Sequence, residues 1–403
     1  MKSVARHLDE CLEAAQPLPP FDVELSDAFS CILAEDVRST VDVPVADLAA
    51  RDGYAVAASD TLGAGDDPVR MHVVADIYAD SVETVRHVEG TAVRIASGAR
   101  MPGGANAVVP LEKTDQGTAE VLISASVRSG DNVRQQAEDL AAGEVILERG
   151  TRISARHIAL LAAAGRSRVT VRPAPRVVVM SVGDELVEPG RPLSPGKVYD
   201  ADSHALATAV RAAGAVVYRV PAVSDEKRTL RDALEDQLVR ADVIIITGGL
   251  SYGGGDTVKE VLSPLGSVRF DNVAISPGRQ MGVGTVGDGT LIFCLPGDPV
   301  AALVAFEVFV RPALRKMAGY THLNTRMIGA RAARGFVSDE GLQDYVPVKV
   351  TGGPAAGYEF SPTGESRHPL LNGLAGANGL AVVPADQTTV AIGDTLECMI
   401  LNG

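Results

Sequence analysis

The chain has 403 residues, of which 46% are hydrophobic and 22% charged, and its formal net charge is −14. This length exceeds what one compact core accommodates, so the sequence predicts a multidomain protein with enough apolar material to fold. The acidic balance excludes a protein that wraps nucleic acid or adheres to an anionic membrane, because both need a basic surface.

The termini and cysteines indicate a cytoplasmic protein. The N-terminal sequence MKSVARHLDECLEAA is amphipathic and lacks the apolar core of a signal peptide. Long apolar stretches such as VAALVAFEVFV are shorter than the roughly 20 residues that span a bilayer. The four cysteines stand far apart and form no CxxC pair, which fits a reducing compartment.

The first 173 residues mix one helix with many short strands. Residues 1–15 predict a short helix, which PLPP ends. From about 40 to 140, short apolar runs interrupted by Gly and Pro predict a β-rich domain. Residues 142–173 predict two strands around one helix, ARHIALLAAAG.

Strands and helices alternate between residues 175 and 320. PRVVVMSVG, AVVYRVP and ADVIIITGG predict buried strands, and SHALATAVRAAG, DEKRTLRDALEDQLVR and DTVKEVL predict the helices between them. This order is typical of a mostly parallel sheet covered on both faces. SVRFDNVAI and GTLIFCLPG add strands, and PVAALVAFEVFVRPALRKMAG adds a long helix. After residue 325, YVPVKV, GLAVVPAD and GDTLECMIL predict a small β-barrel or sandwich.

Four loops follow the strands of this α/β region: VGDEL, VSDEK, TGGLSYGGGD and LPGDP. Ligands of open parallel sheets bind at the carboxyl ends of the strands, where such loops converge. Glycines let backbone N–H groups face an anion such as a phosphate. A carboxylate beside a phosphate repels it unless a divalent cation or a proton lies between them, so the loops together predict Mg²⁺ with a phosphate.

Two glycine motifs have other interpretations. GLSYGGGDT resembles a P-loop, but Gly255 and Asp256 stand where Lys and Ser or Thr are needed, which excludes ATP hydrolysis by that device. An ordinary glycine turn with Asp256 as helix N-cap remains open. GVGTVG at 282–287 matches the dinucleotide pattern GxGxxG but precedes a strand instead of a helix, so we interpret it as a turn.

The acidic residues of the other loops also have structural alternatives. Asp298 followed by Pro299 is typical of an N-cap before a helix, a role that is sufficient by itself to explain the residue. Asp184 and Glu185 directly follow a buried strand, where two adjacent acids favour a metal or solvent contact. The seven histidines show no HExxH spacing, and no GxSxG elbow is present.

Taken together, these motifs resemble the MoeA proteins and the gephyrin E domain. The resemblance rests on SVGDELVEPGRPLSPGKVYDADS, DVIIITGGLSYGGGDTVKEVL and LIFCLPGDPVAALVAFEVFVRPALRKMAG, with RDGYAV and SGARMPGGANAVVPLEKTD upstream. It implies a homodimer with a shared active site, built from a linker domain (1–40 and 140–174), a β-rich lid (41–139), a molybdopterin-binding α/β domain (175–324) and a C-terminal β-barrel (325–403).

The resemblance also implies a reaction and its participants. The family inserts molybdate into adenylylated molybdopterin with Mg²⁺ and releases AMP, and a molybdopterin adenylyltransferase is a possible partner. The implied catalytic residues are Asp52, Glu185, Asp256 and Arg279, with Glu185 and Asp256 at the metal. The implied ligand-binding residues are Ser97, Asp139, Asp225, Gly248, Gly249, Ser251, Ser276, Gly278, Gly297 and Asp298.

Several motifs depart from the family's usual text. DNSAMDGYA becomes ADLAARDGYA, and KPGKP becomes SPGRQ, so that Ser276 and Arg279 replace two lysines. PGNP becomes PGDP with Asp298, an arginine of the C-terminal domain corresponds to Pro347, and the GSG turn is displaced to ESRHP with Ser366 and His368.

These changes remove cations and add an anion where the family binds an oxyanion. Losing one charge-assisted hydrogen bond costs on the order of 2 to 3 kcal/mol. Three alternatives therefore remain: a non-catalytic molybdopterin carrier, a dimeric scaffold, or an enzyme on another nucleotide-linked substrate.

Overall fold

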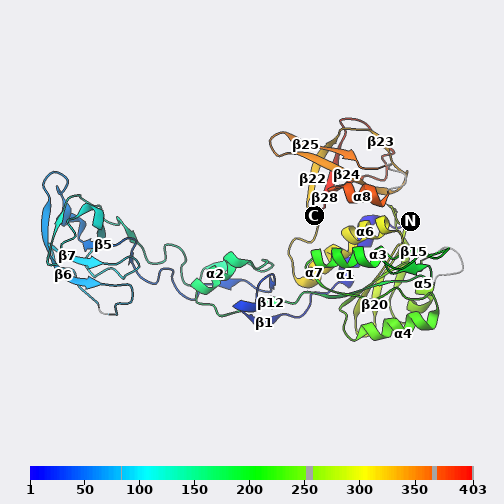
Figure 1. The fold of residues 1–403 in the computed structure, drawn as a ribbon, viewed down its shortest axis with the longest axis horizontal. Helices are drawn as coiled ribbons and strands as arrows, with labels where there is room; N and C mark the ends of the chain where they lie inside the picture. The colour runs from blue at the N-terminus through cyan, green and yellow to red at the C-terminus, as the bar shows by residue number, and fades with distance from the viewer. Residues whose placement is uncertain (83, 251–256, 365–369, 402–403) are drawn as a thin grey trace. The chain divides into compact units, whose positions relative to one another are not determined.

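The computed structural model describes residues 1–82, 84–250, 257–364 and 370–401 (Figure 1). Contacts divide the chain into two compact units. One unit comprises Met1–Phe21, Ser30–Ala34 and Val171–Gly403, and the other comprises Asp22–Phe29 and Glu35–Thr170. Each unit has its own buried apolar clusters, which confirms the predicted multidomain class of α/β and β-rich parts.

A six-stranded sheet forms the centre of the first unit, in the order β16-β13-β17-β21-β20-β18. Its strands are β13 (Arg176–Ser181), β16 (Val216–Arg219), β17 (Val243–Thr247), β18 (Arg269–Asn272), β20 (Gln280–Val286) and β21 (Thr290–Leu295). The first four strands in this order are parallel, and β20 runs antiparallel to both of its neighbours, β21 and β18. The mostly parallel sheet predicted from the continuous apolar runs is therefore confirmed.

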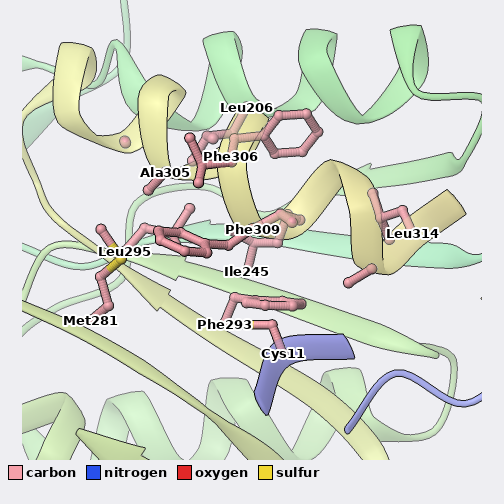
Figure 2. Close-up of a cluster of buried hydrophobic side chains, with 14 of the residues drawn as sticks. Cys11, Leu206, Ile245, Met281, Phe293, Leu295, Ala305, Phe306, Phe309 and Leu314 are labelled. Carbon is pink, nitrogen blue, oxygen red and sulfur yellow. The ribbon is translucent and has the colours of Figure 1, made fainter. Parts of the chain in front are cut away.

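Helices cover both faces of this sheet (Figure 1). One face packs on α1 (Val4–Ala14), α3 (Asp202–Ala212), α6 (Pro299–Ala305), η4 (Phe306–Val310) and α7 (Arg311–Ala318). The other packs on α4 (Lys227–Leu238) and α5 (Thr257–Leu262). Figure 2 shows Phe293 of the sheet beneath Phe309 in the first of these clusters. The predicted long helix is present, with one π-helical turn at η4.

The interpretation of GVGTVG as a turn is wrong, because these residues lie in and directly after strand β20. A Cβ added to Gly282 would lie 2.8 Å from the Phe270 ring, and one added to Gly284 would lie 2.4 Å from the Val268 Cα. The glycines thus leave room for the Phe270 ring and for the backbone just before β18 beside β20. The rejection of a dinucleotide fingerprint stands, because the next element in the chain is strand β21.

The C-terminal part of the first unit is a closed five-stranded barrel. Its strands are β22 (Met327–Ala332), β24 (Gln343–Gly353), β25 (Gly357–Pro362), β26 (Gly379–Val383) and β28 (Thr395–Ile400). The order β24-β25-β22-β28-β26 closes because β26 also pairs with β24. Strand β19 (Ile275–Ser276) adds to β24 in parallel, and α8 (Leu371–Gly376) lies against β24.

The second unit contains a five-stranded sheet in the order β8-β5-β7-β6-β9. These strands are β5 (Gly53–Val56), β6 (Val69–Ile77), β7 (Thr91–Ile95), β8 (Ala107–Pro110) and β9 (Glu120–Ile123). The same unit also contains two short strand pairs and the helix α2 (Ala155–Ala163). The pairs are β4 (Leu48–Ala49) with β10 (Val133–Arg134) and β3 (Val37–Arg38) with β11 (Val145–Leu147). Among the described residues of either unit, none of the helices has the length and apolarity to cross a membrane.

Candidate functional site

The predicted loops of the α/β sheet lie side by side because their strands are neighbours. The backbone N–H of Gly183, after β13, donates to the Val223 carbonyl beyond β16 at 3.0 Å. A hydrogen bond of 2.9 Å joins the Val182 N–H to the carbonyl of Thr247 at the end of β17. The Thr247 hydroxyl contacts the Pro296 carbonyl after β21 at 2.8 Å. Four strand ends therefore form one continuous edge, as the topology of a parallel sheet predicts.

A cavity of about 240 Å³ opens at this edge. Predicted residues Glu185, Gly248 and Gly297 line it. The other lining residues are Ser181, Val182, Leu186, Val198, Tyr199, Asp200, Ala201, Asp202, Thr247 and Pro299. The predicted loops thus contribute Glu185 and glycine backbone to the cavity. Two further acids, Asp200 and Asp202, also line it, although the sequence analysis did not single them out.

Two of the predicted acids lie on adjoining loops. The backbone N–H of Asp184 donates to the Asp225 carboxylate at 3.3 Å, which places the VSDEK loop against the VGDEL loop. The Glu185 side chain folds back over its own loop, since a Cβ added to Gly183 would lie 2.6 Å from its carboxylate oxygen. Among the described residues, neither Glu185 nor Asp225 takes part in an ion pair. Within this part of the chain, the edge thus carries carboxylates whose charge no side-chain cation neutralises.

The predicted glycines are positions where a side chain does not fit. Gly248 has φ of +83°, and an added Cβ would lie 2.4 Å from the Val182 carbonyl oxygen. A Cβ on Gly297 would lie 3.1 Å from the Gly248 Cα. Gly249 has φ of +66°, and Gly278 has φ of +83° with its added Cβ 2.7 Å from Ala301. The absence of side chains here lets the loops after β17 and β21 approach each other.

Two buried carboxyls missed by the sequence reasoning lie at the cavity. Asp200 and Asp202 are 1% and 7% exposed, between β15 (Val198–Tyr199) and the first turn of α3. Burial, reinforced by the charges of Asp200 and Asp298, raises the pKa of the Asp202 carboxyl to about 7. The only sequence signal was the pair of acids in VYDADS, which no helical or strand pattern distinguishes from a solvated loop.

The loop SPGRQ lies between the α/β sheet and the barrel. Ser276 lies in β19, which pairs with β24. Its hydroxyl donates to the carboxylate of Asp344, a buried residue of β24. The Arg279 side chain is exposed, while its carbonyl accepts from the Val273 N–H at 2.8 Å. Asp298 caps α6 by accepting the Ala301 N–H at 2.9 Å, which confirms the predicted N-cap. Pro347 lies inside β24 opposite Leu380.

The second unit brings together two further predicted residues. Asp52 precedes β5 and accepts the backbone N–H of Ser97, after β7, at 2.7 Å. Asp52 also lines a cavity of about 230 Å³ with Asp76, Tyr78 and Arg94. These groups make a small polar recess at one end of the sheet.

Two neighbouring features of that unit were also singled out in the sequence. Arg51, the residue directly before Asp52, forms an exposed ion pair with Glu112 at 2.7 Å. Asp139 is exposed, and its N–H donates to the Val43 carbonyl at 3.0 Å. It does not line the recess of Asp52. Ser251, Asp256, Ser366 and His368 lie outside the described residues.

One cluster with metal-ligating atoms occurs elsewhere in the described part of the chain. His7, Glu10 and Asp271 place such atoms within 4.8 Å of one another. The Lys2 ammonium already pairs with Asp271 and lies 2.6 Å from Glu10. Burial and the charge of Lys2 lower the pKa of His7 to about 4. The Lys2 side chain thus takes the place that a metal ion would need in this cluster. Its contacts with Glu10 of α1 and Asp271 of β18 join these two elements.

The fold and this edge define a protein of the molybdopterin-binding α/β type with two appended β-rich parts. Three family models match in chain order: "MoeA N-terminal region (domain I and II)" over residues 2–165, "Probable molybdopterin binding domain" over 178–316 and "MoeA C-terminal region (domain IV)" over 329–401. The chain belongs to the MoeA family, and with it to the transferases of molybdenum cofactor biosynthesis.

Individual relatives extend over the whole chain. Molybdopterin molybdenumtransferase 2 of Mycobacterium tuberculosis (strain CDC 1551 / Oshkosh) is 37% identical over 98% of this chain and 99% of that protein. Molybdopterin molybdenumtransferase 1 of the same strain is 37% identical over 100% and 99%. The crystal structure of a molybdopterin biosynthesis MoeA protein from Pyrococcus horikoshii superposes with a TM-score of 0.86 at 29% identity, over 100% of this chain and 99% of that one.

Proposed function

We propose that this protein is a molybdopterin molybdenumtransferase that inserts molybdate into adenylylated molybdopterin and releases AMP. The observation that carries the proposal is the cavity at the shared edge of four parallel strands, lined by Glu185 and by the backbone of Gly248 and Gly297. Relatives that extend over the whole chain are named for this transfer. Glycine backbone close to a phosphodiester and acids at its rim suit the cleavage of a pyrophosphate linkage.

The residues at this edge fit Mg²⁺. Carboxylate oxygens are the donors that this ion prefers, and Glu185 and Asp225 bring unneutralised ones to adjoining loops. Asp256 is the further predicted ligand. When bound, the ion would offset the charge that develops on the pyrophosphate oxygens. The chain's own residues would orient the phosphates through backbone N–H groups of the glycine loops and shield them on the apolar side of the cavity with Leu186 and Val198.

The test is AMP release by the purified protein supplied with adenylylated molybdopterin, Mg²⁺ and molybdate. We expect AMP to appear only when molybdate is present, and to disappear when Mg²⁺ is removed with a chelator. Reactions without molybdate serve as the control for spontaneous hydrolysis. Tight binding of the nucleotide without AMP release under any condition would contradict the proposal.

A carrier of molybdopterin is the second candidate, and one observation favours it. Ser276 stands where the resemblance implies a lysine, but its hydroxyl donates to Asp344 and it offers no positive charge to an anion. A carrier would retain the nucleotide and never release AMP, so the same assay separates the two functions.

The proposal includes a cytoplasmic homodimer in which residues of both subunits serve one site. All four cysteines are free, which suits a reducing compartment. Mixing an inactive Asp52→Asn protein with an inactive Glu185→Gln protein should then restore up to about a quarter of the activity, because only one type of shared site has both residues intact. A molybdopterin adenylyltransferase remains the proposed partner that supplies the substrate.

A further inference from the structure

The cavity holds two carboxyls, two residues apart, in opposite surroundings. Asp200 accepts three hydrogen bonds: from the Ser181 hydroxyl at 2.9 Å, the Ser203 N–H at 3.0 Å and the Ser203 hydroxyl at 2.5 Å. All three of these contacts are donated to Asp200 by serine groups. Asp200 is therefore the carboxyl of the pair that only accepts hydrogen bonds.

Asp202 has a different partner. Its Oδ2 contacts the Thr247 hydroxyl, and that same hydroxyl lies 2.8 Å from the carbonyl oxygen of Pro296. A threonine hydroxyl carries one proton, and a carbonyl oxygen can only accept. If the proton of Thr247 goes to Pro296, the contact with Asp202 requires a proton from the Asp202 carboxyl. The arrangement is satisfied by a chain in which Asp202 donates to Thr247 and Thr247 donates to Pro296.

The charges around Asp202 favour the protonated form. Burial opposes the ionisation of Asp202, and so do the neighbouring carboxyls of Asp200, on the preceding segment, and Asp298, before α6. The Thr247 hydroxyl and the first turn of α3 act in the opposite direction. The cation Arg219 contacts the Ser203 hydroxyl at 3.2 Å but is paired with Glu188 at 2.7 Å. Neighbouring carboxyls in such different surroundings are a recurrent arrangement in sites that depend on a proton.

We propose that Asp202 is a positioning residue held as a neutral carboxylic acid, whose proton fixes Pro296 and Gly297 to the end of β17 through Thr247. This inference rests on the proposed function, since Gly297 would face the nucleotide. When Asp202 releases its proton to solvent, Thr247 turns its single proton to the new carboxylate, and the Pro296 carbonyl loses its donor. The glycine rim of the cavity then loosens, and ligand affinity falls as the pH rises.

The matched variants are Asp202→Asn, which keeps a neutral donor to Thr247, and Asp202→Ala, which removes it. Thr247→Val breaks the chain at its centre, and Thr247→Ser preserves the hydroxyl. Hydrogen exchange of the segment 296–302, corrected for the intrinsic effect of pH, reports on the rim without any ligand. We expect faster exchange at about pH 9 than at about pH 5 in wild type and in Thr247→Ser, and no such change in Asp202→Asn. Asp202→Ala and Thr247→Val should exchange fast at both values.

Two further measurements follow the proton and the ligand. The wild-type minus Asp202→Asn difference spectrum should contain the infrared band of one protonated carboxyl at about pH 5, and this band should vanish as the pH rises through about 7. The affinity for ADP with Mg²⁺, a probe with the pyrophosphate and adenosine of the proposed substrate, should fall about tenfold over the same interval in wild type and stay constant in Asp202→Asn.

The outcomes separate this inference from the proposed function. If Asp202→Asn shows the same pH-dependent exchange as wild type, or if the difference spectrum contains no protonated-carboxyl band at about pH 5, the positioning role is wrong. If the exchange and infrared results are as expected but ADP binds to none of the proteins, the role of Asp202 stands and the proposed nucleotide is wrong.

Discussion

The Asp52 carboxylate accepts the backbone N–H of Ser97 at 2.7 Å, which joins the loop before β5 to the loop after β7. Both residues were expected to contact the ligand, and each motif alone permits an ordinary turn. Their contact shows that the motifs RDGYA and ASGARMP build one recess, although the two residues are 45 positions apart in the chain.

Asp52→Asn and Asp52→Ala separate a chemical role of Asp52 from its role in this turn. Asn keeps an oxygen that accepts the Ser97 N–H, so we expect the stability of the second unit to change little, whereas Ala should cost about 1 kcal/mol. If the charge is needed for the reaction, both variants should release AMP at least about 100-fold more slowly. Thermal unfolding and the AMP assay measure the two effects. An Asp52→Asn protein as active as wild type would reduce Asp52 to a turn residue.

Glu185 and Asp184 are adjacent, exposed acids that differ in position, because Glu185 lines the cavity and Asp184 does not. We expect Glu185→Gln to lower turnover about 100-fold or more with less than about a tenfold change in ADP affinity, as for a group that acts on the transition state. Asp184→Asn is the matched control with the same change in charge, and it should leave both values near those of wild type. Equal losses of turnover and affinity in Glu185→Gln would argue against a role at the metal.

We expect Ser276→Lys to lower the KM for molybdate by less than the added positive charge alone suggests. Ser276 donates to Asp344, a residue that is 2% exposed, and burial raises the pKa of the Asp344 carboxyl. A lysine at position 276 would pair with this carboxylate and be withheld from molybdate. We therefore expect Ser276→Lys with Asp344→Asn to lower the KM for molybdate more than Ser276→Lys does. If Ser276→Lys alone lowers the KM for molybdate as much as the double variant does, Asp344 does not withhold the lysine from molybdate.

Gly248→Ala tests whether the glycine rim is fixed by packing. The substitution combines a left-handed φ of +83° with a Cβ 2.4 Å from the Val182 carbonyl oxygen. Gly196→Ala is the matched control, because Gly196 has φ of +81° and nothing within 4 Å of an added Cβ. We expect about 1 kcal/mol of destabilisation for Gly196→Ala and a further 1 to 3 kcal/mol, roughly, for Gly248→Ala. Chemical denaturation measures the loss of stability in both variants. Equal losses would show that the loop around Gly248 moves to accommodate the added Cβ.

Chain order and local patterns were enough to predict the class of the fold and the place of the site. Continuous apolar strands such as RVVVMS and VIIIT, separated by helices of period 3.6, allow few arrangements besides a parallel sheet covered on both faces. Loops after such strands must meet at one edge, so the approach of Glu185, Asp225, Gly248 and Gly297 followed from chain order. Local patterns predict the fold class because the order of apolar and polar residues along a short segment determines whether that segment forms a helix or a strand.

Properties that depend on residues distant in the chain became visible only once the chain was folded. Asp202 reads as one more acid in a polar loop, and it becomes a buried group with a raised pKa because Thr247, Asp200 and Asp298 surround it. GVGTVG has the letters of a turn but lies largely in a strand, because it pairs with β18 and β21. The Phe270 ring and the Val268 backbone explain why Gly282 and Gly284 carry no side chains. Burial, desolvation and close backbone approach arise between segments, so no local pattern of letters encodes them.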